Sequence, residues 1–319
     1  MVIAHVSPTP LEGAAWAAAA AFREAGFDSF CIAPDAYDSG REMPTDYRLP
    51  PVGPAVAKLH AADLVICHQH RPCHERWYPK ARPTVVWVHL PWRPGGGGSP
   101  PGADGWPWGM SGGLQPGLQA SGRPLPELVP LKHRLYQIGL KARSRVRIAY
   151  CPDNVAGRCQ GSSAREATPA ELADLDADVE VVAGLSFADR LRRMAAAHIV
   201  IDGCVSGSYG RASLEALALG CVVVNNCDSS RAWNIQRMTG GCGHPFEPGE
   251  PPRLHERLQR LIGFGPPVLA HMGRRNRDWL TGAWDPAELI SRNLTPLIDV
   301  ALNCRQRPVR GCTRSSQAR

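Results

Sequence analysis

Glycines, hydroxyl-bearing residues and one carboxylate fall close together in the run GSYGRASLEALALG, residues 207–220. Gly203, Gly207 and Gly210 allow the backbone to approach a bound group, and backbone amides at a helix start attract phosphate. Glu215 follows in an Ala- and Leu-rich segment, where an unpaired buried carboxylate would cost several kcal/mol. Sugar hydroxyls would satisfy that carboxylate. Phosphate at the helix start and a ribose beside Glu215 together describe a nucleoside diphosphate.

A plainer interpretation places Glu215 in water, paired with Arg211 one helical turn earlier. Exposed pairs of this kind are common and stabilise a helix by only about 0.2–0.5 kcal/mol. The two hypotheses differ in the burial that they predict for Glu215, so the tertiary structure can separate them.

The region around this run alternates apolar strands with helical segments. Ser186 and Asp189 predict one helix start, and Thr168, Pro169 and Glu171 predict another, in the order of N-cap, first-turn Pro and N3 acid. The strand-like runs are VRIAY (146–150), VEVVA (179–183), HIVID (198–202) and CVVVN (221–225). Strands separated by helices pair in parallel and bind ligands outside their carboxyl ends, which is where the glycine-rich run lies.

The first half of the chain has the same alternation. An Ala-rich helix is predicted over 13–25, among strands predicted at 2–6, 28–33, 63–68 and 84–89. Residues 91–124 are rich in Gly and Pro with isolated Trp, which predicts a long loop. Its Trp side chains would suit stacking on a sugar ring, and a poorly ordered insertion is the alternative.

Two further patterns predict features of the chain, one a possible binding site and the other a helix near the C-terminus. The run CHQHRPCH (67–74) has the side chains of a metal site without the spacing of a zinc site, so contact with a substrate and an ordinary loop are the alternatives. Asp285, Pro286 and Glu288 predict a final helix start, and Pro296 should kink or split the helix that follows.

Bulk properties set the class of protein. A chain of 319 residues predicts two packed units, and no apolar run approaches the roughly 18 residues of a membrane-spanning helix. The start MVIAHV lacks the pattern of a signal peptide, so a cytoplasmic protein with its 11 cysteines reduced is expected. The net charge of +7 and the Arg-rich tail leave peripheral membrane contact possible; a solvated tail is favoured over nucleic-acid binding.

The run HIVIDGCVSGSYGRASLEALALGCVVV resembles the donor-binding segment of GT-B glycosyltransferases, in particular glycosyltransferase family 4. The run SPTPLEGAAWAAAAAFREAGF is similar to the first loop and helix of that family, and IAYCPDN to the start of its second domain. The closing helices of the family resemble RRNRDWLTGAWDPAELISRNLTPLID.

This resemblance implies an α/β fold of two Rossmann-like domains with parallel sheets that face each other across a cleft. The implied activity is retaining, metal-independent, hexosyltransferase-type transfer from a nucleotide sugar, which is a co-substrate, to a carbohydrate, lipid-linked or other acceptor. No cofactor or metal is implied. The expected parts are an acceptor-side domain (1–145), a donor domain (146–285), a helix that crosses back (286–303) and a basic disordered tail (304–319).

The resemblance also implies roles for individual residues. Glu215 would bind the ribose, and backbone around Gly207, Ser208, Tyr209, Gly210, Arg211 and Ala212 the diphosphate and sugar. Gly13 would belong to a loop that closes over the phosphates, and His89 would contact the sugar, with an ordinary strand-end His as the alternative. Arg158 would stabilise the departing diphosphate.

Two departures from the family pattern keep other functions open. Gly207 stands where the family has a sugar-binding Glu, and Gln160 stands where a Lys is expected beside Arg158. A noncatalytic module that binds nucleotide sugars or glycans, or a GT-B nucleotide-sugar epimerase, is therefore an alternative to the transferase.

Overall fold

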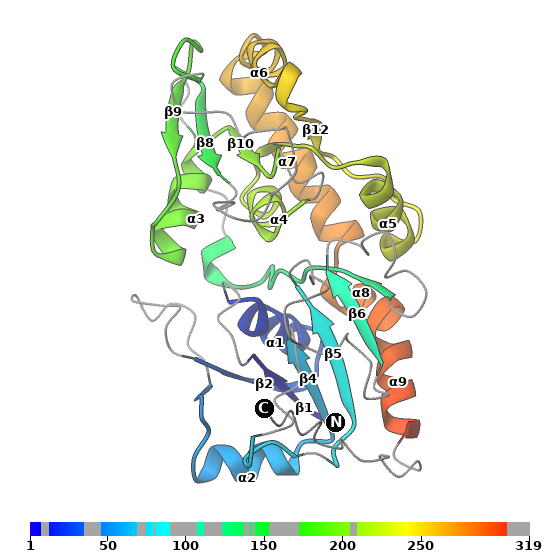
Figure 1. Cartoon of the computed structure of the whole chain (residues 1–319). Coiled ribbons are helices and arrows are strands. Elements are labelled where there is room, and N and C mark those ends of the chain that lie inside the picture. The colour runs from blue at the N-terminus through cyan, green and yellow to red at the C-terminus, as the bar shows by residue number, and fades with distance from the viewer. Residues whose placement is uncertain are drawn as a thin grey trace, which may run out of the picture.

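Two parallel β-sheets, each with helices packed on it, lie one above the other in Figure 1. The computed structural model describes residues 1–7, 13–34, 46–68, 75–79, 81–89, 107–111, 123–136, 141, 144–152, 172–204 and 209–304. The expectations for the helix start at Thr168 and for the Arg-rich tail after Cys304 lie outside these residues. Below, the first unit is the sheet formed by the N-terminal part of the chain with its helices, and the second unit is the other sheet with its helices.

The first unit is built on a 7-stranded sheet in the order β3-β2-β1-β4-β5-β6-β7, and all of its strand pairs are parallel. Its strands are β1 (Val2–Val6), β2 (Asp28–Ala33), β3 (Tyr47–Arg48), β4 (Leu64–His68), β5 (Thr84–Val88), β6 (Trp108–Ser111) and β7 (Arg123–Leu125). Its described helices are α1 (Ala14–Glu24) and α2 (Pro54–Ala61), and the 3-10 turn η2 (Arg134–Tyr136) leads out of it. The predicted helix over 13–25 and all four predicted strands are confirmed.

One prediction for this unit is wrong. Residues 91–124 do not form only a loop, because β6 and part of β7 fall within them. Pro124 lacks an N–H group and sits in β7 at the sheet edge, where a strand tolerates Pro. Buried Trp108 and Leu125 show that packing on the sheet, rather than local propensity, stabilises these two short strands.

The second unit is built on a 5-stranded parallel sheet in the order β12-β11-β10-β8-β9. Its strands are β8 (Arg147–Cys151), β9 (Asp178–Val181), β10 (Ile199–Asp202), β11 (Val222–Asn225) and β12 (Glu247–Pro248). Its helices are α3 (Phe187–Ala196), α4 (Arg211–Ala218), α5 (Ser229–Thr239), the 3-10 turn η4 (Pro251–Arg253), α6 (Leu254–Ile262) and α7 (Gly265–Ala283). Ser186 caps α3 by accepting from the Asp189 amide at 3.1 Å, as predicted.

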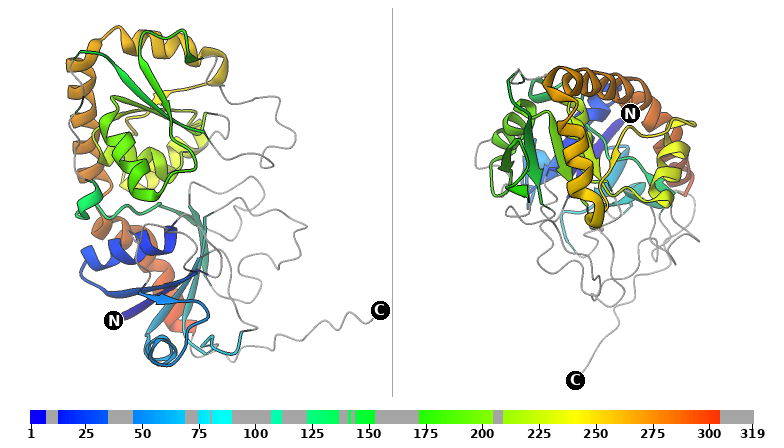
Figure 2. Two further views of the ribbon diagram at one scale, coloured as in Figure 1. Left: turned by 90° about the vertical axis from the view of Figure 1, so that its left-hand side faces the viewer. Right: turned by 90° about the horizontal axis from the view of Figure 1, so that it is seen from above.

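The chain then returns to the first unit. Asp285 caps α8 (Pro286–Leu289) by accepting from the Ala287 and Glu288 amides. A π-helical segment (Ile290–Leu294) separates α8 from α9 (Thr295–Asn303), which confirms the predicted break at Pro296. Helix α8 packs on α1 and α9 on β5, and Figure 2 shows α7 running along one side of the molecule towards them. Among the described residues, no helix has the length and apolarity needed to cross a bilayer.

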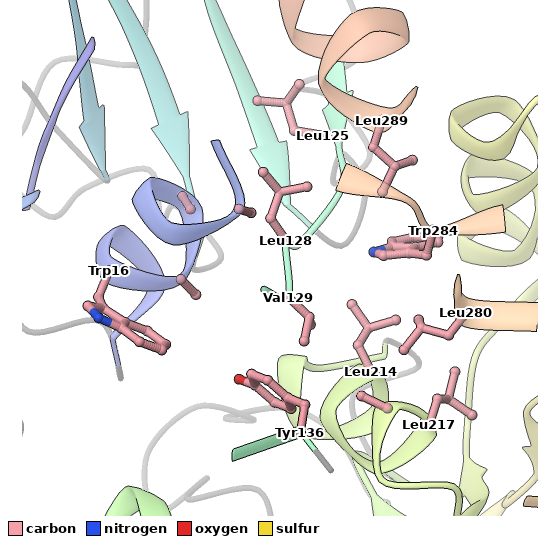
Figure 3. Packing of buried hydrophobic residues seen from close by; sticks show 14 of the residues in the cluster. Trp16, Leu125, Leu128, Val129, Tyr136, Leu214, Leu217, Leu280, Trp284 and Leu289 are labelled. Atoms are coloured by element: carbon pink, nitrogen blue, oxygen red, sulfur yellow. The ribbon is translucent and has the colours of Figure 1, made fainter. Parts of the chain in front are cut away.

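One hydrophobic cluster joins the two units (Figure 3). Trp16, Leu128 and Tyr136 enter it from the N-terminal part of the chain, and Leu214 and Trp284 from the C-terminal part. The indole Nε1 of Trp284 donates a hydrogen bond to the backbone oxygen of Glu127 at 2.8 Å. We call this region of contact between the units the junction.

Helix α7 also packs against α4. Arg277 donates to the backbone oxygens of Tyr136 and Ala218, and Asn276 donates to the Cys221 oxygen at 3.1 Å. At Gly273 the two backbones come so close that a Cβ atom there would lie 2.0 Å from the Gly220 oxygen. A side chain at position 273 would therefore push α7 away from the loop that follows α4.

We predict that Gly273→Ala lowers the free energy of unfolding by about 2–3 kcal/mol, because the added methyl group meets backbone that cannot rotate away. Gly282→Ala is a matched control, since Gly282 lies in the same helix with nothing within 4 Å of its Cβ position. That control should stabilise the protein by up to about 1 kcal/mol, through helix propensity. Chemical denaturation measures both, and equal effects would contradict the close approach.

Candidate functional site

The glycine-rich run, by which we mean residues 203–210, follows the carboxyl end of β10 and leads into α4. Gly203 has φ 59°, a left-handed conformation that favours glycine. Behind the run, Ser213 Oγ donates to Asp202 Oδ2 at 2.6 Å and Asn225 Nδ2 donates to Ser213 Oγ at 2.9 Å. A Cβ atom at Gly210, the residue before α4, would lie 3.2 Å from the same Asp202 oxygen. A carboxylate therefore lies close to the positive end of α4.

Glu215 is fully buried, with an exposed fraction of 0%. Its Oε2 accepts from Arg190 Nη2 at 2.7 Å, and its Oε1 accepts from Arg211 Nε at 3.0 Å and from the Tyr136 hydroxyl at 3.4 Å. The hypothesis of an exposed Glu215 is wrong, although its pairing with Arg211 is confirmed. In this structure two guanidinium groups and a phenol satisfy the carboxylate.

Aromatic side chains from the first turns of α1 and α3 lie beside the ion pairs of Glu215. The Phe187 ring lies under both guanidinium groups, at 5.3 Å from Arg190 Cζ and 5.8 Å from Arg211 Cζ. Trp16, in the first turn of α1, meets Phe187 edge-on with ring centroids 6.1 Å apart. Two guanidinium groups and an aromatic ring therefore surround the buried carboxylate.

Tyr136 remains a hydrogen-bond donor in this cluster. Burial, followed by the negative charge of Glu215, raises the pKa of the Tyr136 hydroxyl well above its ordinary value. Tyr136 belongs to the segment that leaves the first unit, so this contact ties that segment to α4.

Other predicted site residues lie in different settings. The Tyr209 ring is buried, stacked on Phe246 at 5.8 Å and edge-on to Trp284 at 6.0 Å. Its side chain thus anchors the end of the glycine-rich run to the junction. Gly13 precedes α1 with φ 72°, and Ala212 is half-buried in the first turn of α4. Arg158, Gly207 and Ser208 lie outside the described residues.

His89 directly follows β5, and both of its ring nitrogens are hydrogen-bonded within the protein. Nδ1 lies 3.0 Å from Glu127 Oε1, and Nε2 lies 2.6 Å from His68 Nδ1. His68 Nε2 in turn lies 3.0 Å from His5 Nδ1. In this arrangement His89 offers no further ring nitrogen to a sugar.

Solved structures of known proteins match almost the whole chain. AviGT4, a glycosyltransferase involved in avilamycin A biosynthesis, is 13% identical with a TM-score of 0.51, over 95% of this chain and 98% of its own. HepE of Anabaena, solved with UDP and glucose, is 14% identical with a TM-score of 0.54, over 94% of this chain and 100% of its own. A mutant O-GlcNAc transferase of Thermobaculum terrenum is 15% identical with a TM-score of 0.51, over 95% of this chain and 68% of its own.

The chain has the GT-B fold. This confirms the predicted fold class of two Rossmann-like units with parallel sheets. No protein-family model matches the sequence, and no curated protein does.

Within this GT-B fold, contacts at the junction bring the ends of the two sheets together. Glu127, which bonds His89 at the end of β5, also acts electrostatically on Tyr209 at the end of the glycine-rich run. Sequence analysis did not find Arg190, Tyr136 or Glu127. A weak signal existed for the histidines alone, because three predicted strands of the first half carry His at or near their carboxyl ends.

Of residues 67–74, the structure describes Cys67 and His68. Neither supports the hypothesis of a metal site. Cys67 Sγ contacts the Tyr78 hydroxyl at 3.3 Å, and His68 bonds His5 and His89. Within the described ranges, no group of three His, Cys, Asp or Glu side chains could hold a metal ion.

We predict that Glu215→Gln lowers the free energy of unfolding by about 3–5 kcal/mol, because it leaves two guanidinium groups around a neutral amide. The matched control is Glu247→Gln, which removes a half-exposed partner of Arg257 and should cost less than about 1 kcal/mol. Urea titration of both variants tests this. A cost for Glu215→Gln no greater than that of the control would contradict the buried ion pair.

We also predict an acid-sensitive fold. Burial, then the charges of Arg23 and His89, lowers the pKa of His5 to about 3 from 6.5. The unfolded chain therefore takes up a proton between these values that the folded chain does not, so the stability due to neutral His5 is complete above pH 6.5 and declines below it. At about pH 4 the loss is about 3 kcal/mol.

Urea titrations at several pH values measure this decline. His5→Leu should flatten it, whereas His60→Gln, at an exposed histidine of α2, should leave it unchanged. A decline of the same steepness in His5→Leu would assign the acid sensitivity to other groups.

Proposed function

We propose that this protein is a glycosyltransferase that moves a sugar from a nucleoside-diphosphate sugar to an acceptor. The observation that carries the proposal is the place of the glycine-rich run. In a GT-B fold that spans nearly the whole chain, this run leads from the carboxyl end of β10 into α4, beside the junction. Helix starts at such a strand end bind phosphates through backbone amides.

The finer activity that we propose is retaining, metal-independent, hexosyltransferase-type transfer of the family 4 kind. Its support is the likeness of residues 198–224 to the donor-binding segment of that family. A nucleotide-sugar donor agrees with the likeness in fold to HepE, which was solved with UDP and glucose. We propose a carbohydrate, lipid-linked or other hydroxyl-bearing acceptor, and donor binding mainly by residues 146–285.

The charges around α4 suggest how a diphosphate would be held. The Asp202 carboxylate beside the helix start opposes a second anion there. We propose that the guanidinium group of Arg158 offsets it. We propose that the amides from Ser208 to Ala212 and the loop at Gly13 complete the phosphate site.

Ribose binding by Glu215 requires an exchange of hydrogen-bond partners. The carboxylate has no exposed surface, so a ribose hydroxyl must replace a contact that already exists. The contact from the Tyr136 hydroxyl, at 3.4 Å, is longer than the contacts from Arg190 at 2.7 Å and Arg211 at 3.0 Å. We propose that Tyr136 yields its place to the ribose while both ion pairs persist.

Chemistry would rest on positioning and on stabilising the leaving diphosphate. Arg158 and the amides at the start of α4 would neutralise the charge that develops on the departing phosphate. His89 is placed at the end of β5 with its ring fixed by Glu127 and His68, so we propose that it shapes the sugar side of the site.

Calorimetry with UDP, GDP, ADP and TDP tests the proposal. We expect one nucleotide to bind the wild-type protein. Arg158→Gln should weaken that binding at least about tenfold, the loss of one charge-assisted contact of about 1.4 kcal/mol. Arg260→Gln, at an exposed residue of α6, is the matched control and should bind normally. Failure of all four nucleotides to bind would overturn the donor site.

Release of nucleoside diphosphate from a panel of donor sugars then separates transfer from binding alone. Turnover that survives a chelator would support the metal-independent scheme, and its loss would overturn that part. Binding without release, in the presence of acceptor mixtures, would favour the noncatalytic module that Gly207 permits.

A further inference from the structure

Three imidazoles and one carboxylate form an unbroken file of hydrogen bonds across the first sheet. The file runs from Glu127 Oε1 to His89 Nδ1 at 3.0 Å, then from His89 Nε2 to His68 Nδ1 at 2.6 Å, and then from His68 Nε2 to His5 Nδ1 at 3.0 Å. His5 lies in β1, His68 ends β4 and His89 follows β5, so neighbouring strands carry successive members. We call these four residues the histidine file.

The histidine file is shielded from water. His5 and His68 have exposed fractions of 0%, and the side chains of His89 and Glu127 are 5% and 12% exposed. Trp87 stacks on His68 and His89, with ring centroids 5.5 and 5.2 Å apart, and Phe22 meets His5 edge-on at 4.9 Å. At the inner end, His5 Nε2 is buried and has no hydrogen-bond partner among the described residues.

Counting the ring protons decides which nitrogen donates and which accepts at each link of the histidine file. A neutral imidazole has one N–H donor and one acceptor nitrogen, whereas a carboxylate only accepts. His89 must therefore donate from Nδ1 to Glu127, which leaves its Nε2 to accept from His68 Nδ1. By the same step His68 Nε2 accepts from His5 Nδ1, and His5 Nε2 is left as a bare acceptor. Three neutral rings supply the three protons that the three links need.

We propose that Glu127 sets the tautomers of all three histidines as Nδ1–H through this file, and that His5 and His68 are positioning residues that hold the His89 ring fixed at the junction. This inference concerns the protein without ligand and stands whether or not the protein transfers sugar.

A proton cannot be added to His89 alone. An N–H at His89 Nε2 would meet the N–H at His68 Nδ1, so His68 and then His5 would also have to change tautomer. The change would place an N–H donor at His5 Nε2, where the described residues provide no acceptor, at a cost comparable to that of an unmade buried hydrogen bond.

The charged and titratable groups around the two buried histidines favour the uncharged state of His5 and His68. From α1, Arg23, which pairs with Asp46 at 3.1 Å, disfavours a proton on His5. Burial, then the charges of His89 and His5, lowers the pKa of His68 well below its ordinary value. From the second unit, Tyr209 lies within the electrostatic influence of Glu127 and is itself uncharged, because burial raises its pKa well above the ordinary value.

Nitrogen-15 NMR of the histidine rings tests the proposal without any nucleotide. In the wild-type protein we expect His5, His68 and His89 to be Nδ1–H, with at least about a tenfold preference, throughout about pH 6–8. Glu127→Gln replaces the obligate acceptor with an amide that can also donate, so Nε2–H forms should appear at His68 and the preference should fall at least about tenfold. An Nε2–H tautomer in the wild-type protein, or an unchanged preference in Glu127→Gln, would overturn the proposal.

Trp284→Phe is the matched control. It removes the indole that donates to the backbone oxygen of Glu127 and keeps the carboxylate, so the three tautomers should stay as in the wild type. If Glu127→Gln fails to fold, the wild-type tautomers alone decide, because any ring that carries its proton on Nε2 breaks the file. Loss of the Nδ1–H pattern in Trp284→Phe would also count against it, since the carboxylate remains.

Discussion

A carboxylate without access to water must find its hydrogen-bond donors inside the protein, and at Glu215 this requirement joins three separate segments. Arg190 comes from α3, Arg211 from the same helix α4, and Tyr136 from the segment that leaves the first unit. The position of α4 relative to the junction therefore depends on one buried ion-pair cluster. Because α4 starts where the glycine-rich run ends, the same cluster also sets the geometry of the proposed phosphate site.

A second set of contacts fixes α4 from its other end. Helix α7 approaches so closely at Gly273 that no side chain fits, and Arg277 bridges the end of α4 and the backbone of Tyr136. The chain then turns at Trp284, whose indole bonds Glu127, before α8 and α9 pack on the first unit. Apolar packing at the junction (Figure 3), together with a few directed hydrogen bonds, thus connects both sheets through the C-terminal helices.

Charge is distributed unevenly between the two sides of the junction. On the side of the second unit, Arg190 and Arg211 pair with Glu215, and Asp202 lies beside the start of α4. On the side of the first unit, burial lowers the pKa of His5 to about 3 and the pKa of His68 well below its ordinary value. The ion pairs therefore lie beside α4, while the neutral rings of His5 and His68 provide hydrogen-bond direction rather than charge.

The periodicity of apolar residues and the capping residues were enough to predict α1, α3, the start of α8 and the main strands of both sheets, because these signals are local. The last two strands of the first sheet, β6 and the edge strand β7, escaped prediction, since Pro and Gly mask their propensity and the pairing of β6 with β5 and of β7 with β6 decides their structure. Burial of Glu215 followed from its Ala- and Leu-rich helix. Its partners Arg190 and Tyr136 did not, because they stand 25 and 79 positions away in the sequence. In the same way the sequence alone placed histidines at or near the carboxyl ends of three predicted strands, and only the parallel order β1-β4-β5 decided that they meet in one file, because contact between distant residues is a property of strand order and packing.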